Sequence, residues 1–97
     1  MLSLAHLKEN MLVMKPYLVS KYAISQLYIF GSYAREEQTD KSDIDLLVDF
    51  KKTPDLLTFL EIEEYMSKQL HVDVDLVPKR KLKKQLKEQI LSEAIKI

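Results

Sequence analysis

The chain lacks cysteine altogether and has a single glycine among its 97 residues. The lack of cysteine excludes a disulfide framework, a thiol nucleophile and a cysteine-ligated zinc site, and it makes the cytoplasm the expected compartment. Globular proteins contain about 7% glycine on average. We therefore expect Gly31 to occupy a position where the backbone has no alternative to glycine.

A net charge and a long apolar run are also missing. The 15 basic and 15 acidic residues cancel, so no global basic field exists and direct nucleic-acid binding is not expected. No apolar run approaches the roughly 20 residues of a membrane span, and Lys8 and Glu9 interrupt the first apolar stretch, so neither a membrane segment nor a signal peptide is expected. The charges are nevertheless sorted: residues 36–75 carry twelve acids and four bases, and residues 76–97 carry seven bases and two acids.

Hydrophobic spacing predicts one α/β domain over residues 1–97, with a small mixed sheet flanked by helices. Ser3 is the expected N-cap of the first helix, and Pro16 should kink or divide that helix. In chain order we expect a helix over 4–22, a strand over 26–30, a short helix over 32–37, a strand over 43–50, a helix from Thr53 as N-cap through Pro54 to 69, a strand over 71–77, and a last helix through Leu82, Leu86, Ile90 and Ala94.

Two pairs of acidic residues lie on predicted strands. Asp43 and Asp45 should point to one face about 6.5 Å apart, because strand side chains alternate. Their repulsion would be costly without a cation, whereas a divalent metal with oxygen ligands would turn it into binding energy. Asp73 and Asp75 repeat the pattern, and a third carboxylate could complete a magnesium site if the two strands are neighbours. The alternative is that each pair simply faces solvent.

The dipeptide Gly31-Ser32 separates a hydrophobic strand from a short helix. A missing Cβ, the N–H groups at a helix start and a serine hydroxyl would suit a phosphate there. A glycine turn with a serine cap is the simpler reading, and both can hold together. Arg35 is a further candidate phosphate contact, with a surface ion pair to Asp40 as its alternative.

Other site types fit less well. Val48 stands where a calcium-binding EF-hand loop needs its glycine, and neither a Walker-type nor a dinucleotide-binding glycine motif is present. A glycosyltransferase-like D-x-D motif has no further support. We expect His6 and His71 to be structural or surface residues, and Tyr33 to pack in the core, although it could also stack on a base.

Three blocks of the sequence resemble a known family: Phe30-Gly-Ser-Tyr-Ala-Arg35, Ser42-Asp-Ile-Asp-Leu-Leu-Val48 and Val74-Asp-Leu-Val77. Their order and spacing are similar to those of the minimal nucleotidyltransferases (MNT), small members of the polymerase-beta-like nucleotidyltransferase superfamily that are usually encoded beside a HEPN protein. Two positions depart from the pattern. Glu36 stands where many members have glycine, and Asp73 is an additional acid.

The resemblance implies a role for each matching residue. Gly31 and Ser32 would hold the triphosphate of ATP, with Arg35 as an added contact. Asp43 and Asp45 would ligate two Mg²⁺ ions. Asp75 would ligate the catalytic metal and help activate the acceptor hydroxyl, in an in-line displacement at the α-phosphate.

The implied acceptor is a tyrosine of a cognate HEPN RNase toxin, which this chain would adenylylate as an antitoxin. Two alternatives stay open: transfer to a small molecule such as an aminoglycoside, and inhibition of the partner by occlusion without catalysis. Self-association and a complex with the toxin are both left open by the sequence.

Overall fold

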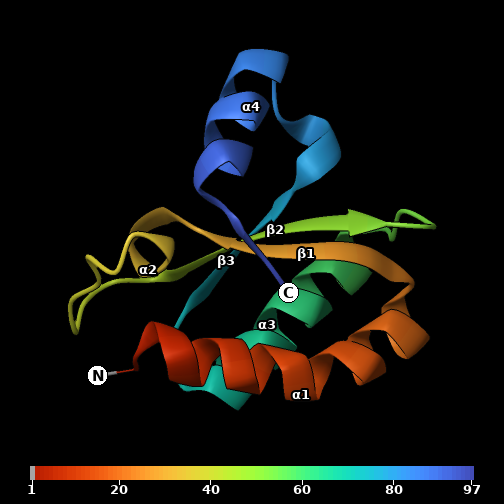
Figure 1. Ribbon diagram of the computed structural model, residues 1–97. Coiled ribbons are helices and arrows are strands. Elements are labelled where there is room, and N and C mark those ends of the chain that lie inside the picture. The colour runs from red at the N-terminus through yellow and green to blue at the C-terminus, as the bar shows by residue number, and fades with distance from the viewer. Residues whose placement is uncertain (1) are drawn as a thin grey trace.

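In the computed structural model, which describes residues 2–97, four strands form one mixed sheet with helices on both of its faces (Figure 1). The strand order is β3-β2-β1-β4; β2 and β3 are parallel, and the other two pairs are antiparallel. The predicted fold class is therefore confirmed. In chain order the elements are α1 (Leu4–Tyr22), β1 (Ile24–Phe30), α2 (Gly31–Ala34), β2 (Ile44–Phe50), α3 (Leu56–Leu70), β3 (Val74–Pro78), the 3-10 helix η1 (Lys79–Lys81), α4 (Lys84–Glu93) and β4 (Ile95–Lys96).

The hydrophobic core lies between α1, α3 and one face of the sheet (Figure 1). Alternate residues of β2, including Ile44, Leu46 and Val48, are buried in this core. Because successive side chains of a strand point to opposite faces, Asp45 and Asp49 must lie on the other face of the sheet. The core thereby determines which face carries the acidic residues of β2.

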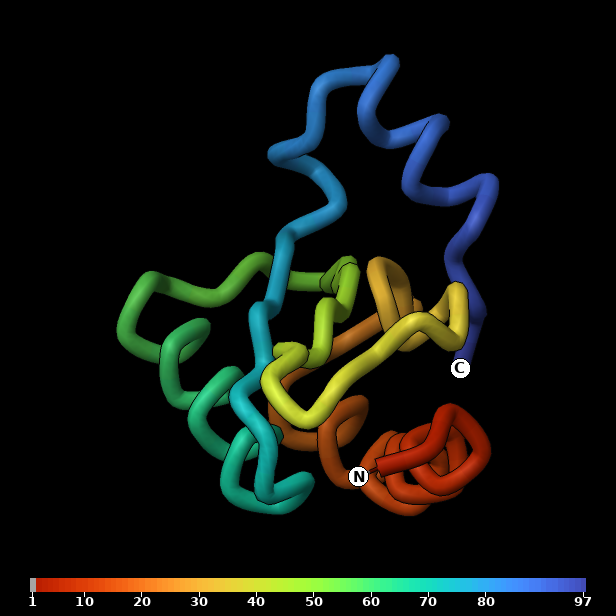
Figure 2. Tube along the Cα trace, turned by 90° about the vertical axis from the view of Figure 1, so that its left-hand side faces the viewer, coloured from red at the N-terminus to blue at the C-terminus, as the bar shows by residue number. Residues whose placement is uncertain are grey.

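Residues 79–97 form an arm over that second face. The arm leaves the sheet after β3, rises through η1 and α4, and returns as β4 beside β1 (Figure 2). No residue of α4 is buried. The return is secured where the Ile97 amide donates to the Leu27 carbonyl at 2.9 Å. The short strand β4 was not predicted, because two residues are too few to show an alternating pattern.

Within residues 2–97, no helix has both the length and the apolar character needed to cross a membrane.

The predicted start of α3 was wrong. Asp55, not Thr53, is the N-cap, and its Oδ1 accepts a hydrogen bond from the Thr58 amide at 2.8 Å, which lowers the pKa of Asp55. Pro54 consequently lies before the helix rather than in its first turn. The first helix follows the prediction more closely, because Ser3 caps it and Pro16 lies inside it without dividing it.

Two other boundaries differ because the chain adopts left-handed backbone conformations. Glu36 has φ +56°, and the short helix α2 already ends at Ala34 instead of residue 37. His71 has φ +56° and terminates α3, so β3 begins at Val74 rather than at residue 71. The strand over β1 is longer than expected and begins at Ile24.

Candidate active site

Asp45 and Asp75 lie directly beside each other on neighbouring strands. Asp45 of β2 is in register with Asp75 of the parallel strand β3 and with Phe30 of the antiparallel strand β1. Residues in register on adjacent strands point to the same face, with the strands about 4.8 Å apart. Asp43 immediately precedes β2 and is two residues from Asp45. The condition that we set for a third carboxylate, that the third strand lies beside the second, is thus met, and Asp43, Asp45 and Asp75 lie at the same end of the sheet.

The electrostatics of this end are unfavourable for three negative charges. The side chain of Asp45 is partly buried, and this burial raises its pKa; the neighbouring carboxylates of Asp75 and Asp43 raise the pKa further. The Arg35 guanidinium acts in the opposite direction, which places its positive charge within reach of Asp45. An added cation would favour the ionised form of Asp45 in the same way.

The donors at this end are carboxylate oxygens, which are the ligands that hard divalent cations such as Mg²⁺ prefer. Within residues 2–97, no three acidic or histidine side chains are already arranged as a metal cluster. The carboxylates therefore have the chemistry of a magnesium site, while a bound ion would have to draw their side chains together.

The single glycine, Gly31, lies against the carboxylate of Asp45. Gly31 has φ +72°, a region that L side chains rarely adopt. A Cβ at this position would collide with Oδ2 of Asp45 and lie only 3.0 Å from its Cγ. The expectation that the backbone tolerates no side chain here is confirmed. Ser32 follows in the first turn of α2, so the Gly31-Ser32 turn lies immediately beside the acidic residues.

Arg35 connects α2 to the arm. Its Nε donates to Oε1 of Glu37 at 2.7 Å, and its Nη1 donates to Oε2 of Glu93, on α4, at 3.3 Å. The ion pair with Asp40 that we considered is not among those formed within residues 2–97, so that alternative was wrong. The guanidinium instead lies between the Gly31-Ser32 turn and α4.

A hollow of about 250 Å³, which we call the slot, lies between this turn and α4. The four-residue spacing of Leu82, Leu86, Ile90 and Ala94 predicts the last helix, and the structure confirms a helix there with shorter bounds; two of these residues, Leu86 and Ile90, line the slot. Polar residues recur on this helix at the same four-residue spacing as the apolar ones, and this pattern is the sequence signal that could have indicated that the helix lines a hollow. The slot is lined by Phe30, Gly31, Arg35, Leu86, Gln89, Ile90 and Glu93.

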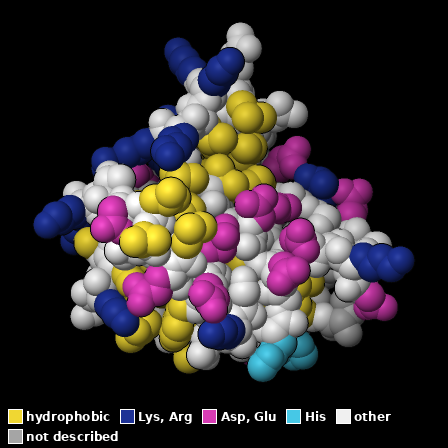
Figure 3. All heavy atoms as spheres, turned by 180° about the vertical axis from the view of Figure 1, so that it is seen from behind, with side chains coloured by type: hydrophobic (Ala, Val, Ile, Leu, Met, Phe, Trp, Pro, Cys, Tyr) yellow, Lys and Arg dark blue, Asp and Glu magenta, His cyan; other side chains and the backbone are white. Residues whose placement is uncertain are grey.

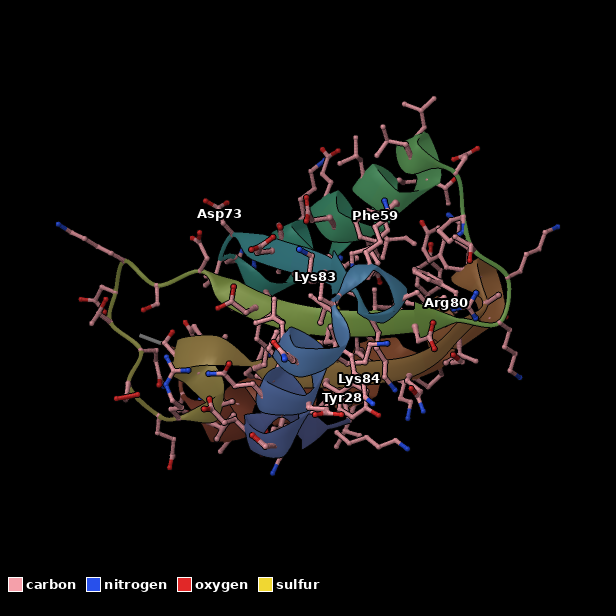
Figure 4. The ribbon with its side chains drawn as sticks, turned by 90° about the horizontal axis from the view of Figure 1, so that it is seen from above. Tyr28, Phe59, Asp73, Arg80, Lys83 and Lys84 are labelled. Atoms are coloured by element: carbon pink, nitrogen blue, oxygen red, sulfur yellow. The ribbon has the colours of Figure 1, made fainter. Side chains whose placement is uncertain are left out.

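The space-filling view shows acidic side chains gathered on the body beneath the arm, with apolar side chains of the arm directly above them (Figure 3). Seen from above, α4 lies over the second face of the sheet, and Asp73 and Arg80 lie toward opposite ends of β2 (Figure 4). The acidic end is therefore open on the side of Asp73 and covered by the arm on the side of β1.

Residues beside the three acids have mainly structural contacts. The Asp73 carbonyl accepts a hydrogen bond from the Ile44 amide at 2.9 Å and joins the starts of β2 and β3.

His71, Asp43 and Asp73 line a second, open hollow of about 420 Å³. The suggestion that Tyr33 could stack on a base was wrong, because only 2% of this residue is exposed and it lies in the core.

Residues 13–97 match the family described as polymerase beta, nucleotidyltransferase. Among curated proteins, the protein adenylyltransferase MntA of Thermococcus cleftensis is 38% identical over 95 residues, covering 98% of this chain and 96% of that protein. A protein of Methanocaldococcus jannaschii, provisionally named a protein adenylyltransferase, is 48% identical over 83 residues, covering 86% of this chain and 85% of that protein.

Solved structures with similar folds carry related descriptions. One provisionally named a minimal nucleotidyltransferase has a TM-score of 0.83 and 34% identity, and the match covers 97% of this chain and 95% of that one. A toxin-antitoxin complex with AMP-PNP gives a TM-score of 0.75 at 28% identity, covering 90% and 70% of the two chains. A complex of tri-AMPylated Shewanella oneidensis HEPN toxin with MNT antitoxin gives 0.69 at 26% identity, covering 92% and 69%.

The family match spans most of the chain, and the paired acidic strands lie beside the glycine turn as the resembling blocks require. This chain is therefore a nucleotidyltransferase and belongs to the polymerase beta nucleotidyltransferase family.

Proposed function

We propose that residues 1–97 act as one protein adenylyltransferase domain that transfers AMP from ATP to a tyrosine hydroxyl of a HEPN-domain RNase toxin, and so serves as the antitoxin. The observation that carries this proposal is the in-register pair of Asp45 and Asp75 directly beside the Gly31 turn. The relatives named protein adenylyltransferase and the solved toxin-antitoxin complexes support the choice of a protein acceptor.

Each residue near the acidic end has a task in this proposal. The backbone of Gly31 and the hydroxyl of Ser32 hold the triphosphate, because glycine lets phosphates approach the main chain closely. Arg35 lies at the end of α2 and adds a positive charge for the phosphates. Asp75 is the most exposed of the paired acids and accepts the hydrogen bond, and then the proton, of the incoming hydroxyl.

The reaction forms one bond and breaks one bond. The acceptor oxygen bonds to the α-phosphorus of ATP, the bond from that phosphorus to the bridging oxygen breaks, and pyrophosphate leaves. Asp43, Asp45 and Asp75 would hold two Mg²⁺ ions, which when bound supply positive charge against the attacking and leaving oxygens. The three carboxylates fit this role because they repel one another and offer only oxygen ligands.

Intact-mass spectrometry of a HEPN toxin tests the proposal. After incubation with ATP, magnesium and a substoichiometric amount of this chain, the toxin should gain about 329 Da for each AMP transferred. Asp75→Asn should abolish the gain. An unmodified toxin that is inhibited only at an equimolar ratio, and equally well by Asp75→Asn, would show that the chain acts by occlusion instead.

A further inference from the structure

We propose that the slot between β1 and α4 binds the nucleobase of the donor nucleotide, and that Gln89 selects adenine. This inference rests on the proposed adenylyltransferase function and extends it to the choice of nucleotide. It assigns a task to α4, none of whose residues is buried although its spacing is amphipathic.

The position of the slot supports a nucleotide site. Gly31 and Arg35 line it, so it begins at the turn proposed to hold the phosphates and continues under α4. Phe30 also lines it and is in register with Asp45, so its side chain is on the face that carries the acidic pair. A nucleotide whose phosphates lie at Gly31 can therefore extend its nucleoside part into the slot without leaving this face.

The lining has the chemistry of a base-binding site. Phe30, Leu86 and Ile90 provide apolar surfaces, and aromatic rings stack well on bases. The volume of about 250 Å³ is below the range of pockets that enclose drug-sized molecules, about 300–1,000 Å³, so it suits the nucleoside part rather than a whole triphosphate. Apolar side chains that the core leaves uncovered would thus be covered by the base.

Gln89 is the one lining residue with an uncharged polar side chain. Its amide carries both a donor and an acceptor, which matches the N7 acceptor and the N6 amino donor of adenine. Guanine presents two acceptors, N7 and O6, on the same edge, so the oxygen of the Gln89 amide would face an acceptor in either orientation of the amide. Glu93 lies farther along α4, where it is paired with Arg35, and is not needed to read the base.

Titration calorimetry with magnesium and three probes tests this inference: ATP, GTP and inorganic tripolyphosphate. The wild-type chain should bind ATP at least about tenfold more tightly than GTP. Gln89→Leu should lose about tenfold in ATP affinity and most of this preference, while its affinity for tripolyphosphate stays at the wild-type value. Gln85→Leu is the matched control, because it removes the same amide from an exposed position of α4 that does not line the slot.

Leu86→Ser provides a second variant at an exposed position. It should weaken ATP and GTP alike by several fold and leave tripolyphosphate unchanged, because it removes an apolar wall and no charge. Equal ATP affinity in Gln89→Leu and wild type, or a wild type that binds ATP and GTP equally, would overturn the inference while leaving the proposed transfer intact. A wild type that binds neither ATP nor tripolyphosphate would overturn the proposed function as well.

Discussion

Gly31 and Asp45 constrain each other at the centre of the site. The glycine has φ +72°, and its missing Cβ leaves room for the Asp45 carboxylate. The single glycine in the sequence already indicated a special backbone position, but the neighbour that requires it could not be known without the pairing of β1 and β2. Contact between a turn and a strand residue fourteen positions away is a tertiary property.

Gly31→Ala should therefore destabilise the chain for two separable reasons. The left-handed backbone costs a residue with a side chain about 1–2 kcal/mol, and the new Cβ also collides with Asp45. In an Asp45→Ala background the collision is relieved while the backbone cost remains. Urea unfolding of the four proteins in the double-mutant cycle should show a coupling free energy on the order of 1 kcal/mol. Strictly additive effects would contradict the close approach of Gly31 and Asp45.

Asp45 and Asp49 lie on the same face of β2 but should respond oppositely to the same substitution. Asp45 is disfavoured as an anion by burial and by Asp75 and Asp43, whereas Asp49 Oδ1 pairs with Arg80 Nε at 2.9 Å. Measured in EDTA at pH 7, Asp45→Asn should raise the free energy of unfolding by less than about 1 kcal/mol, because solvent still screens a group that is only partly buried. Asp49→Asn should lower it. The Asp45 variant should also lose nucleotide transfer.

The pH dependence of the Asp45→Asn effect follows from the direction of the pKa shift. The pKa of Asp45 is raised in the folded chain, so the folded state binds this proton more tightly than the unfolded state. Ionisation then costs folding free energy at neutral pH, and this cost disappears below the ordinary carboxyl pKa of 3.8, where both states are protonated. The stabilisation by Asp45→Asn should shrink as the pH falls from 7 toward 4. A gain that grows over this range would contradict the shift.

Glu36 shows both the value and the limit of sequence comparison at one residue. The resemblance implies glycine at this position, and the structure gives Glu36 φ +56°. Glycine would adopt this backbone conformation without strain. The sequence indicated the unusual position, but the left-handed turn that ends α2 had to be seen in the structure.

At the scale of elements, α3 holds the edge strand β3 in place. Ser67 Oγ accepts a hydrogen bond from the Val74 amide at 3.0 Å, and Glu63 Oε2 accepts one from the Leu76 amide at 2.8 Å. These two amides flank Asp75 on the edge of the sheet that no other strand covers. Side chains of α3 therefore satisfy the open edge and keep Asp75 beside Asp45.

Glu63→Ala should leave the Leu76 amide unpaired at a residue that is only 4% exposed. We expect a loss of about 1–3 kcal/mol in the free energy of unfolding, measured with urea. Glu64→Ala is the control, because Glu64 forms an exposed pair with Lys68 at 3.0 Å and its removal should change stability by less than about 0.5 kcal/mol. Equal losses in the two variants would argue against Glu63 as an edge-capping residue.

The backbone amides of the arm should be less protected from hydrogen exchange than those of the sheet. Because α4 buries no residue, its backbone amides should exchange with solvent at least about tenfold faster than those of the central strand β2. If the slot holds a base, ATP with magnesium should slow exchange in α4, whereas tripolyphosphate should not. Hydrogen-exchange mass spectrometry measures both effects. Exchange in α4 as slow as in β2 would show that the arm is packed more firmly than its burial indicates.

The helices and strands before the arm, up to β3, were easier to predict than the arm itself. The D-x-D spacing and the apolar runs around it indicated β2 and β3, and the parallel pairing then brought Asp45 beside Asp75. The stripe through Leu86 and Ile90 equally indicated a helix, but helical spacing alone does not say which surface will cover it. In this chain it faces a slot rather than the core.

At the scale of the whole molecule, the sheet separates two tasks. Figure 1 shows α1 and α3 on one face of the sheet, where the core lies, and α4 over the other face. The second face carries Asp45, Asp75 and the slot, and acidic side chains gather beneath the arm (Figure 3). Although the net charge is zero, residues 36–75 carry twelve acids and four bases, whereas residues 76–97, which include the arm, carry seven bases and two acids. Carboxylates that could hold a cation and basic residues therefore occupy different segments of the chain.

The most direct test of nucleotide transfer follows the two ends of ATP separately. A HEPN toxin is incubated with this chain, magnesium and ATP labelled on either the α- or the γ-phosphorus, and the label on the toxin is counted after removal of free nucleotide. Because the acceptor oxygen attacks the α-phosphorus and pyrophosphate leaves, only the α-label should appear on the toxin, and Asp43→Asn with Asp45→Asn should abolish it. Transfer of the γ-label, or α-label that persists in the double variant, would contradict the account.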